Sequence, residues 1–308
     1  MILTITANPA IDKVYFVDEF VMGNVYRPHK LTVSAGGKGL NVSRVARILG
    51  EEVTAMGFVG GSSGNYIQNE ISKLGILTNF TPISGETRTC INISDRLGCS
   101  GELLEEGPTI TEIEKDAFFT QFNSTINACD IVCISGSLAK GLDSSFYSKL
   151  IKLCNIKNIP VIIDTSGATL SKIIDENPFM VKPNCDEAQQ LTGIYPKTTN
   201  DVKTFLRFLK EKGVTVPFVS LGKNGSATLI NDKYYHFKIP SVTVVNSVGS
   251  GDSTVAGIAV GICRNLPIID AIRLGMASGI ANTQFQQTGL VTTDLVEKFY
   301  KQIDVVEL

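Results

Sequence analysis

Apolar residues recur along the chain in two patterns that alternate through most of its length. Short runs rich in β-formers predict buried strands at residues 2–7, 53–60, 130–136, 159–165, 179–184 and 217–222. Segments with helical spacing lie between them, at residues 40–49, 66–74, 113–126, 144–157, 186–191 and 201–212. Strand and helix in alternation predict an α/β fold with a parallel sheet covered on both faces. Such sheets bind ligands beyond the carboxyl ends of their strands.

Two regions depart from this alternation. Residues 12–34 and 85–106 alternate in polarity like strands, and each contains a turn candidate. We expect both to be antiparallel ribbons inserted into the α/β pattern, forming a small sheet outside the main core. A partly apolar sheet of that kind needs a cover, either its own ligand or a second subunit. No linker, fixed-period repeat or clear break divides the chain, so residues 1–308 are expected to form a single domain.

Composition narrows the class of protein. The 308 residues are 43% hydrophobic and 19% charged, with a formal net charge of -2, which is ordinary for a globular chain with a large core. The two signs are spread along the chain, so we expect neither a nucleic-acid groove nor a membrane surface. Seven Cys without a Cys-x-x-Cys pair speak against a disulfide framework and a structural zinc site. With no signal-peptide pattern, reduced thiols in a cytoplasmic protein are expected.

The stretch NSVGSGDSTVAG, residues 246–257, places Gly249, Ser250 and Gly251 directly before Asp252. A glycine-rich turn that opens a helix brings its N–H groups close to a ligand at the positive end of the helix dipole. Such a helix start binds anions, phosphate above all. A carboxylate there would repel phosphate, unless it accepts a proton beside it. The stretch therefore indicates phosphoryl transfer, while a plain turn with a helix-stabilising Asp stays open.

Two common nucleotide-binding loops are excluded for this stretch. The Walker A pattern GxxxxGK[ST] occurs nowhere in the chain. The run GSGDST begins like a dinucleotide fingerprint, but Thr254 stands where the third glycine belongs, and the run comes late in the chain.

Three further stretches could hold a phosphorylated polyol. In SAGGKGLNVSR, residues 34–44, adjacent glycines precede a Lys that can reach an anion and an Asn that can read hydroxyls. In NPAID, residues 8–12, the terminal Asp12 can accept two sugar hydroxyls. In ETRTCI, Arg88 can clamp a phosphate with two parallel hydrogen bonds. Each stretch taken singly can also be a plain turn or a surface charge.

Two motifs follow strand candidates where a nucleotide would lie. These are KPNCDEA, residues 182–188, and SLGKNG, residues 220–225. Asn184 and Glu187 offer the oxygen ligands that Mg²⁺ prefers. The alternative is that the acidic residues favour a helix N-terminus electrostatically, with no metal.

Together these stretches resemble the ribokinase/PfkB family of sugar kinases over essentially the whole chain. AGGKGLNVSR is similar to the first signature of that family and NSVGSGDSTVAG to the second. NPAID, the KPN-x-x-E run and SLGKNG fall in the family's order. The resemblance implies a ribokinase-like three-layer α/β/α sandwich with a β-sheet lid that is commonly shared between the subunits of a dimer. It also implies ATP as phosphoryl donor and Mg²⁺ as the partner ion.

The resemblance further implies roles for individual residues. Asp252 matches the catalytic base, and the amides of Gly249, Ser250 and Gly251 match an anion hole. The positions that match contacts to the sugar or its phosphate are Asp12, Arg27, Gly36, Gly37, Lys38, Asn41, Arg88 and Ser137. Those in nucleotide-binding motifs are Lys182, Asn184, Ser220, Gly222, Lys223, Gly225 and Asn282, and Asn184 and Glu187 are the candidate metal ligands. Ser250 and Thr254 depart from the ribokinase form, which speaks against a free-sugar substrate.

Within the family, GGKGLNVSR, ETRTC, ISGSLAKGL and DTSGATL look most like tagatose-6-phosphate kinases, while GFVGG and VNSVGSGDS look equally like 1-phosphofructokinases. We therefore expect a ketohexose phosphate as acceptor, either tagatose 6-phosphate or fructose 1-phosphate. Two remote alternatives are a nicotinamide-dependent oxidoreductase, disfavoured by the failed fingerprint, and a non-catalytic sugar-phosphate sensor, disfavoured by the intact Asp252.

Overall fold

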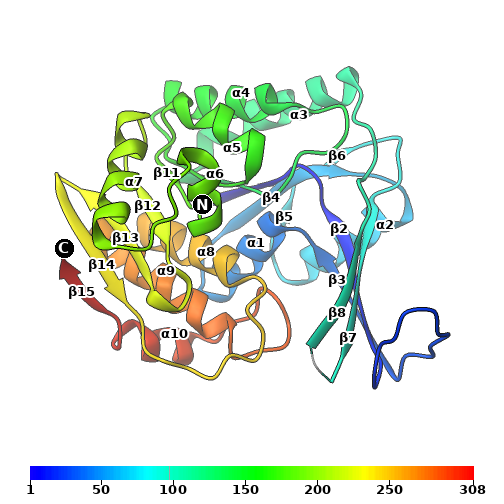
Figure 1. Cartoon of the computed structure of the whole chain (residues 1–308). Coiled ribbons are helices and arrows are strands. Elements are labelled where there is room, and N and C mark those ends of the chain that lie inside the picture. The colour runs from blue at the N-terminus through cyan, green and yellow to red at the C-terminus, as the bar shows by residue number, and fades with distance from the viewer. Residues whose placement is uncertain (97) are drawn as a thin grey trace.

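The structure is a computed structural model that describes residues 1–96 and 98–308. At its centre lies a parallel sheet in the order β11-β10-β9-β1-β4-β5, with β6 beside β4 (Figure 1). Its strands are β1 (Ile2–Thr6), β4 (Val53–Val59), β5 (Leu77–Thr78), β6 (Thr81–Pro82), β9 (Ile131–Ser135), β10 (Val161–Asp164) and β11 (Met180–Val181). The predicted parallel α/β fold is confirmed.

Both faces of this sheet are buried because its strands are apolar at consecutive positions. On β1, Leu3 and Ile5 join one hydrophobic cluster while Ile2 joins the other. One face is covered by α1 (Lys38–Ile48), α2 (Gly61–Lys73), α8 (Ser250–Cys263) and α9 (Ile268–Asn282), with α10 (Thr293–Tyr300) against α9. The other is covered by α3 (Glu112–Thr125), α4 (Ser144–Ile156), α5 (Gly167–Ile173), α6 (Cys185–Thr192) and α7 (Thr199–Glu211). The result is the expected three-layer α/β/α arrangement.

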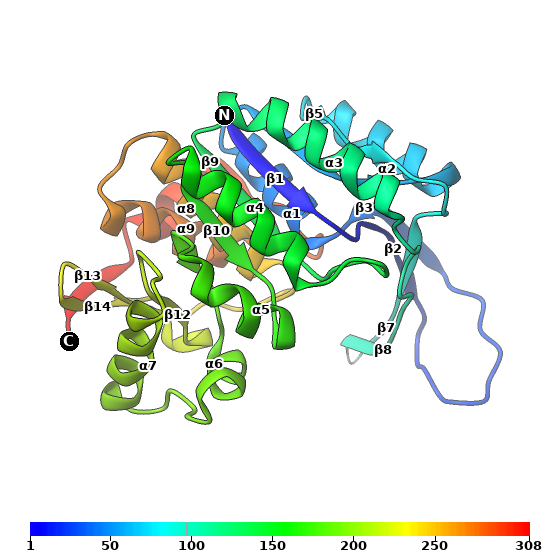
Figure 2. The same cartoon turned by 90° about the horizontal axis from the view of Figure 1, so that it is seen from above.

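The two inserted ribbons pair with each other to form a lid sheet. Its strands are β2 (Ala10–Phe16), β3 (Lys30–Gly36), β7 (Arg88–Asp95) and β8 (Gly98–Leu104), in the order β3-β2-β7-β8. Each ribbon is antiparallel, as predicted, but β2 and β7 join in parallel. Figure 2 shows the lid at one end of the central sheet, with the loop before β3 projecting from it.

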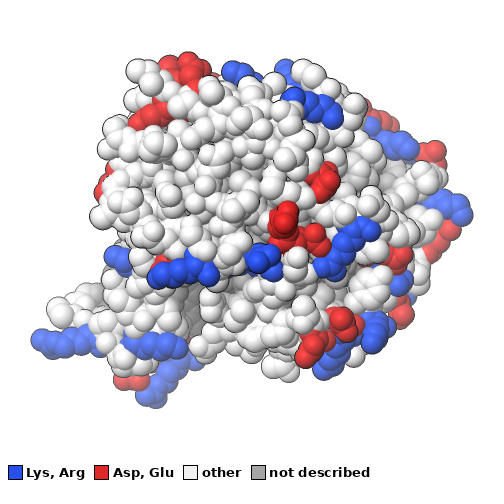
Figure 3. Space-filling model, turned by 180° about the vertical axis from the view of Figure 1, so that it is seen from behind, with Lys and Arg blue, Asp and Glu red and all other residues white. Residues whose placement is uncertain are grey.

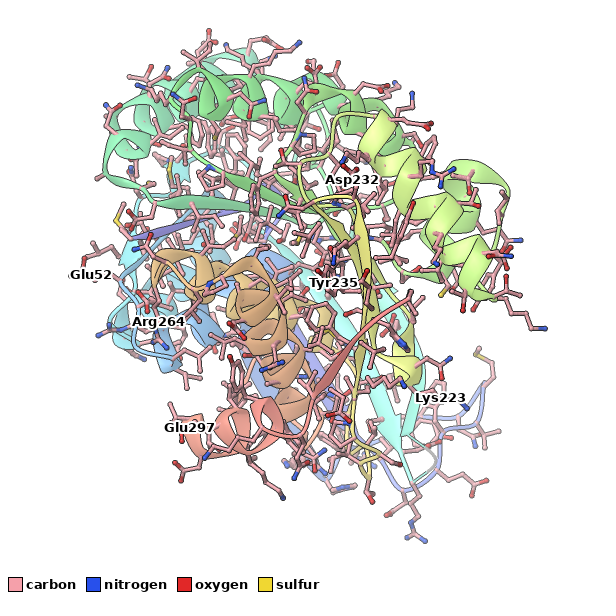
Figure 4. The ribbon with its side chains drawn as sticks, turned by 90° about the vertical axis from the view of Figure 1, so that its left-hand side faces the viewer. Glu52, Lys223, Asp232, Tyr235, Arg264 and Glu297 are labelled. Carbon is pink, nitrogen blue, oxygen red and sulfur yellow. The ribbon has the colours of Figure 1, made fainter. Side chains whose placement is uncertain are left out.

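A third sheet was only partly predicted. It consists of β12 (Phe218–Ser220), β13 (Ser226–Ile230), β14 (Lys233–Lys238) and β15 (Asp304–Glu307), all antiparallel. Residues 217–222 were expected to continue the parallel alternation, and the structure pairs β12 with β13. Two backbone bonds, Val216 N to Phe179 O and Ser220 N to Pro183 O, also join this segment to the residues on either side of β11. Figure 4 labels Asp232 at the β13–β14 turn and Tyr235 on β14.

The strand order creates a switch point beside β1. The chain moves from β1 to β4 on one side and later returns to β9 on the other. Loops that leave β1 and β9 at their carboxyl ends therefore diverge, which opens a crevice where ligands bind in such sheets. Two short 3₁₀ turns, residues 126–128 and 174–176, follow directly after α3 and α5.

The surface mixes both signs of charge. Figure 3 shows Lys and Arg interspersed with Asp and Glu around broad uncharged areas on the face seen from behind. Within the described ranges, no helix combines the length and hydropathy needed to cross a bilayer. The Cys side chains that the structure describes are free thiols, most of them buried.

Candidate active site

Helix α8 begins at a glycine in the left-handed conformation. Gly249 is the N-cap, with φ 80°, and Asp252 is the third residue of the helix, with 5% of its surface exposed. Glycines let α8 lie close against α9, because a Cβ at Gly257 would stand 2.7 Å from the Gly275 Cα. This close packing fixes the helix in the core and thereby fixes the Asp252 carboxyl group at the carboxyl edge of the sheet.

The amides at the start of α8 are only partly free. Ser250 N donates to the Ser247 carbonyl at 3.2 Å, so one of the three amides expected in the anion hole is already engaged. The amides of Gly249 and Gly251 make no hydrogen bond within the described part of the chain. Two N–H groups at the positive end of α8 are therefore available to an anion.

Asn41 on α1 orients the Asp252 carboxylate. Its Nδ2 donates to Asp252 Oδ2 at 2.8 Å, and its Oδ1 accepts from Arg44 Nη1 at 2.7 Å. Arg44 in turn donates to the Ala35 carbonyl. All these groups are buried. Asn41 was expected to contact a sugar, and the structure shows that its amide also holds Asp252 in place.

Two lysines and a second aspartate surround Asp252. Lys38 Nζ lies 3.3 Å from Asp164 Oδ1, and Lys182 Nζ lies 3.5 Å from Asp164 Oδ2. A Cβ at Gly251 would stand 3.0 Å from Lys182 Nζ, so this ammonium group lies against the start of α8. Sequence reasoning missed Asp164, although DTSG directly after a buried strand was a usable signal. Lys38, which was expected at the substrate phosphate, pairs with Asp164 in the structure.

The two aspartates have opposite pKa shifts. Burial raises the pKa of Asp252 to about 6, and the negative charge of Asp164 adds to the effect. Asn41 and the two lysines oppose this shift. Burial also acts to raise the pKa of Asp164, but Lys182 and Lys38 outweigh it and hold that pKa below its usual range. Asp164 is thus a fixed anion, while Asp252 can exchange a proton near neutral pH, as a general base must.

Asp12 and two glycines form a cradle between the lid and the sheet. A Cβ at Gly36 would stand 2.2 Å from the Asp12 carboxyl group, so only glycine fits beneath it. Gly37 caps α1 with φ 118°, a conformation that favours glycine. Burial raises the pKa of Asp12 to about 6, although neighbouring arginines lower it. The structure brings these three predicted residues together.

Arg88 at the start of β7 is engaged within the protein. Its Nη1 donates to the Glu105 carbonyl at 2.8 Å and its Nη2 to the Asn8 carbonyl at 2.9 Å. Its buried Nε has no hydrogen-bond partner in the described chain. These bonds anchor the guanidinium between the β1 loop and the lid, near Asp12, whose pKa it helps to lower.

Two predicted substrate contacts are exposed and not bonded to Asp252. Arg27 is exposed in the loop between β2 and β3, and Ser137 is exposed just after β9. No hydrogen bond or ion pair within residues 1–96 and 98–308 joins either side chain to Asp252. Ser137 nevertheless follows a strand end beside β1, on the edge where the cluster lies.

The predicted nucleotide segment forms a tight turn at the end of β12. Ser220 donates through its N and its Oγ to the Pro183 carbonyl, at 2.9 and 3.2 Å, which joins the two predicted nucleotide motifs. Gly222 and Lys223 are exposed in the turn η3 (Gly222–Asn224), and Figure 4 labels Lys223. Gly225 has φ 86°, and a Cβ there would stand 1.9 Å from the Phe237 carbonyl oxygen, so the turn needs glycine.

The residues expected to hold Mg²⁺ bond to each other. Asn184 Oδ1 accepts from Glu187 N at 2.8 Å, and Glu187 Oε2 accepts from Asn184 N at 2.9 Å, a reciprocal capping box at the start of α6. The Glu187 charge also reaches Lys38, whose pKa it helps to raise. Among the described side chains, no group of three His, Cys, Asp or Glu residues could hold a metal ion by itself.

Asn282, which was expected to contact the nucleotide, is held by hydrogen bonds within the protein. Its side chain is 0% exposed and bonds only within the protein. Nδ2 donates to the Val248 carbonyl and Oδ1 accepts from Gly289 N, both at 2.9 Å. Asn282 therefore positions the backbone that leads into α8, where a buried amide needs internal partners.

The chain is similar to several known proteins over its full length. The family model for pfkB family carbohydrate kinases matches residues 5–294. Tagatose-6-phosphate kinase of Staphylococcus epidermidis is 40% identical over 313 residues, which covers 100% of both chains. A solved structure from Thermotoga maritima, named "Possible 1-phosphofructokinase", is 28% identical with a TM-score of 0.90, covering 100% of this chain and 99% of that one. Phosphofructokinase-2 of Escherichia coli is 25% identical with a TM-score of 0.89, covering 97% and 98%.

Proposed function

Because the chain belongs to the pfkB family of carbohydrate kinases, and is thus an ATP-dependent sugar-phosphate kinase, we propose that it converts tagatose 6-phosphate to tagatose 1,6-bisphosphate. The observation that carries the proposal is Asp252, a buried carboxyl group with a pKa of about 6 at the start of α8, where the amides of Gly249 and Gly251 make no hydrogen bond within the described residues. The full-length likeness to a tagatose-6-phosphate kinase supports the choice of sugar.

In the proposed reaction, Asp252 takes the proton of the C1 hydroxyl group. That oxygen forms a bond to the γ-phosphorus as the bond to the β,γ-bridging oxygen breaks, and ADP leaves. Negative charge spreads over the transferring oxygens in such a reaction. The amides of Gly249 and Gly251 are proposed to stabilise this charge together with the ammonium group of Lys182, which lies against the start of α8. Asn41 holds the carboxylate so that its proton-accepting oxygen is fixed.

The residues present fit a Mg²⁺ ion. Asp164 Oδ2 is buried and makes no hydrogen bond in the described chain, and its ionic contact is Lys182 Nζ at 3.5 Å, so it can still accept from a metal-bound water. Glu187 lies close enough to influence Lys38, on the same side of the site. Asp164 and Glu187, with Asn184 behind them, would hold the ion largely through its waters. When bound, Mg²⁺ would neutralise part of the negative charge of the phosphate groups.

The cradle is proposed to hold the sugar. Asp12 is proposed to accept hydrogen bonds from two sugar hydroxyl groups, and the backbone at Gly36 and Gly37 to let the sugar approach closely. Ser137 is proposed to contact the same sugar. Arg88, which two backbone carbonyls hold in place, is proposed to bind the phosphate of the acceptor. Arg27 is proposed to add a second cation there. The turn at Gly222, Lys223 and Gly225 is proposed to carry the nucleotide.

The closest alternative acceptor is fructose 1-phosphate, phosphorylated at C6. The likeness to the Thermotoga maritima structure supports it. The test measures kcat/KM for both sugars side by side by coupled ADP release. We expect tagatose 6-phosphate to be preferred at least about tenfold, equivalent to about 1.4 kcal/mol; the reverse preference would assign the alternative. If neither sugar supports ADP release, the sensor alternative is favoured. Binding of NAD(H) would favour the oxidoreductase alternative.

We further propose that the protein is a cytoplasmic homodimer joined through the lid. Its outer strands expose apolar side chains: Leu31 and Val33 on β3 are 47% and 40% exposed, and Leu103 and Leu104 on β8 are 64% and 61% exposed. A sheet that exposes such residues needs a cover. Light scattering on the purified chain tests this: a monomer at micromolar concentration would refute it.

A further inference from the structure

A cavity separate from the Asp252 site lies on the outer side of α1. It has a volume of about 510 Å³, and its walls come from β3, α1, α2 and residues 287–290. This volume matches that of typical small-molecule pockets. Neither the proposed sugar cradle nor the nucleotide turn contributes to its lining.

Two arginines line the cavity without an ion-pair partner. Arg44 is 8% exposed and bonds only to the uncharged Asn41 and Ala35 carbonyl groups. Arg47 bonds to the Glu51 backbone carbonyl at 3.3 Å. Within the described ranges, neither guanidinium lies within 4.0 Å of a carboxylate.

The acidic residue of the cavity does not neutralise these charges. Glu70 on α2 pairs with Lys73 at 2.5 Å, outside the lining. The cavity therefore keeps a net positive charge. The charges of Asp12 and Asp252 act on Arg44 from outside the lining. Guanidinium groups bind phosphate and carboxylate with particular strength.

We propose that this cavity binds the oxyanion group, phosphate or carboxylate, of a small metabolite that regulates the enzyme. The apolar wall, which includes Ile48 and Leu74, would contact the rest of that molecule. Binding is coupled to catalysis through Arg44, because the same guanidinium holds Asn41, which holds Asp252. A bound anion competes for Arg44 and weakens the hydrogen bonds from Arg44 to Asn41 and from Asn41 to Asp252, so turnover falls as the cavity fills. The binding step does not depend on which sugar is the acceptor.

The cavity can be given its own reporter. The chain contains no Trp, and Leu74 lines the cavity with 47% of its surface exposed, so Leu74→Trp adds a single fluorophore at the rim. The probes are inorganic phosphate and malonate, titrated at constant ionic strength. We expect a saturable fluorescence change with at least one of them. No saturable change with either probe would overturn the proposal.

Two further variants in the Leu74→Trp background assign the anion to the cavity. Arg47→Gln removes a lining charge that plays no part in the catalytic cluster, and we expect it to raise the Kd of the probe about tenfold. Arg207→Gln, on α7 and outside the lining, is the matched control and leaves Kd unchanged. Equal Kd values in the two variants would overturn the site.

The coupling has its own measurement. An anion that merely competes with the sugar phosphate raises KM and leaves kcat unchanged, whereas an anion in the cavity lowers kcat at saturating substrates. We expect kcat to fall over the same concentration range as the fluorescence changes, and Arg47→Gln to shift both curves together. Binding without any change in kcat would refute the regulatory part of the proposal.

Discussion

Replacing Asp252 by Asn removes a buried carboxyl group whose pKa is raised from 3.8 to about 6. Between these pH values the folded chain keeps a proton that the unfolded chain has lost, so stability falls as pH rises through this window. Above about pH 6 the buried carboxyl group is ionised and the full loss of stability is present. A difference of two pKa units corresponds to about 3 kcal/mol of folding free energy. We therefore expect the Asp252→Asn protein to be more stable than the wild type by about 1–3 kcal/mol at pH 7.5 and by little near pH 4.

The same substitution is expected to abolish most of the activity. Loss of a general base lowers turnover by about 10²–10⁴-fold, or about 2.7–5.4 kcal/mol. The amide oxygen of the variant can still accept from Asn41 Nδ2, so the site keeps its geometry. We expect KM for both substrates to change less than about threefold.

Calorimetry at several pH values and ADP-release kinetics measure the two effects on one preparation. The matched control is Asp164→Asn, because Lys38 and Lys182 favour the ionised form of Asp164. That variant should melt below the wild type at pH 7.5, while Asp252→Asn melts above it by at least about 2 °C. Near-normal kcat in Asp252→Asn would end the base assignment, and a lower melting temperature would refute the burial argument.

Three other outcomes are expected. Gly36→Ala places a Cβ 2.2 Å from the Asp12 carboxyl group and should raise KM for the sugar phosphate at least about tenfold. The control is Gly101→Ala on the lid, where nothing lies within 4 Å of the added Cβ, and it should leave KM unchanged. Arg88→Ala should raise KM for the sugar phosphate about 10–100-fold and leave KM for ATP within about twofold; equal changes would contradict the assignment. kcat/KM should rise with pH to a plateau above about pH 6, as Asp252 loses its proton, and a flat profile from pH 5 to 8 would contradict this.

Local patterns in the sequence predicted the core of the fold because their causes are local. The apolar runs at β1, β9 and β10 specify strands buried on both faces. The N-cap of α7 is Thr198, whose side chain accepts a hydrogen bond from Asp201 N, a contact between residues three positions apart. The antiparallel strands β13 to β15 were not predicted from the sequence. β14 pairs with β15 near the end of the chain, and a strand's partner is not encoded in its own residues.

The candidate site, like the fold, was predicted from the sequence only in part. A glycine-rich helix start followed by Asp252 is a pattern of a few adjacent residues, and its chemistry can be read from the sequence. The pKa of Asp252 depends on Asn41, 211 positions away in the sequence, and on Asp164 at the end of β10. The burial of Asn282 likewise came from packing alone. The sequence by itself determined which groups are present and the elements that carry them, whereas electrostatics and burial depend on distances in space, which only the tertiary structure decided.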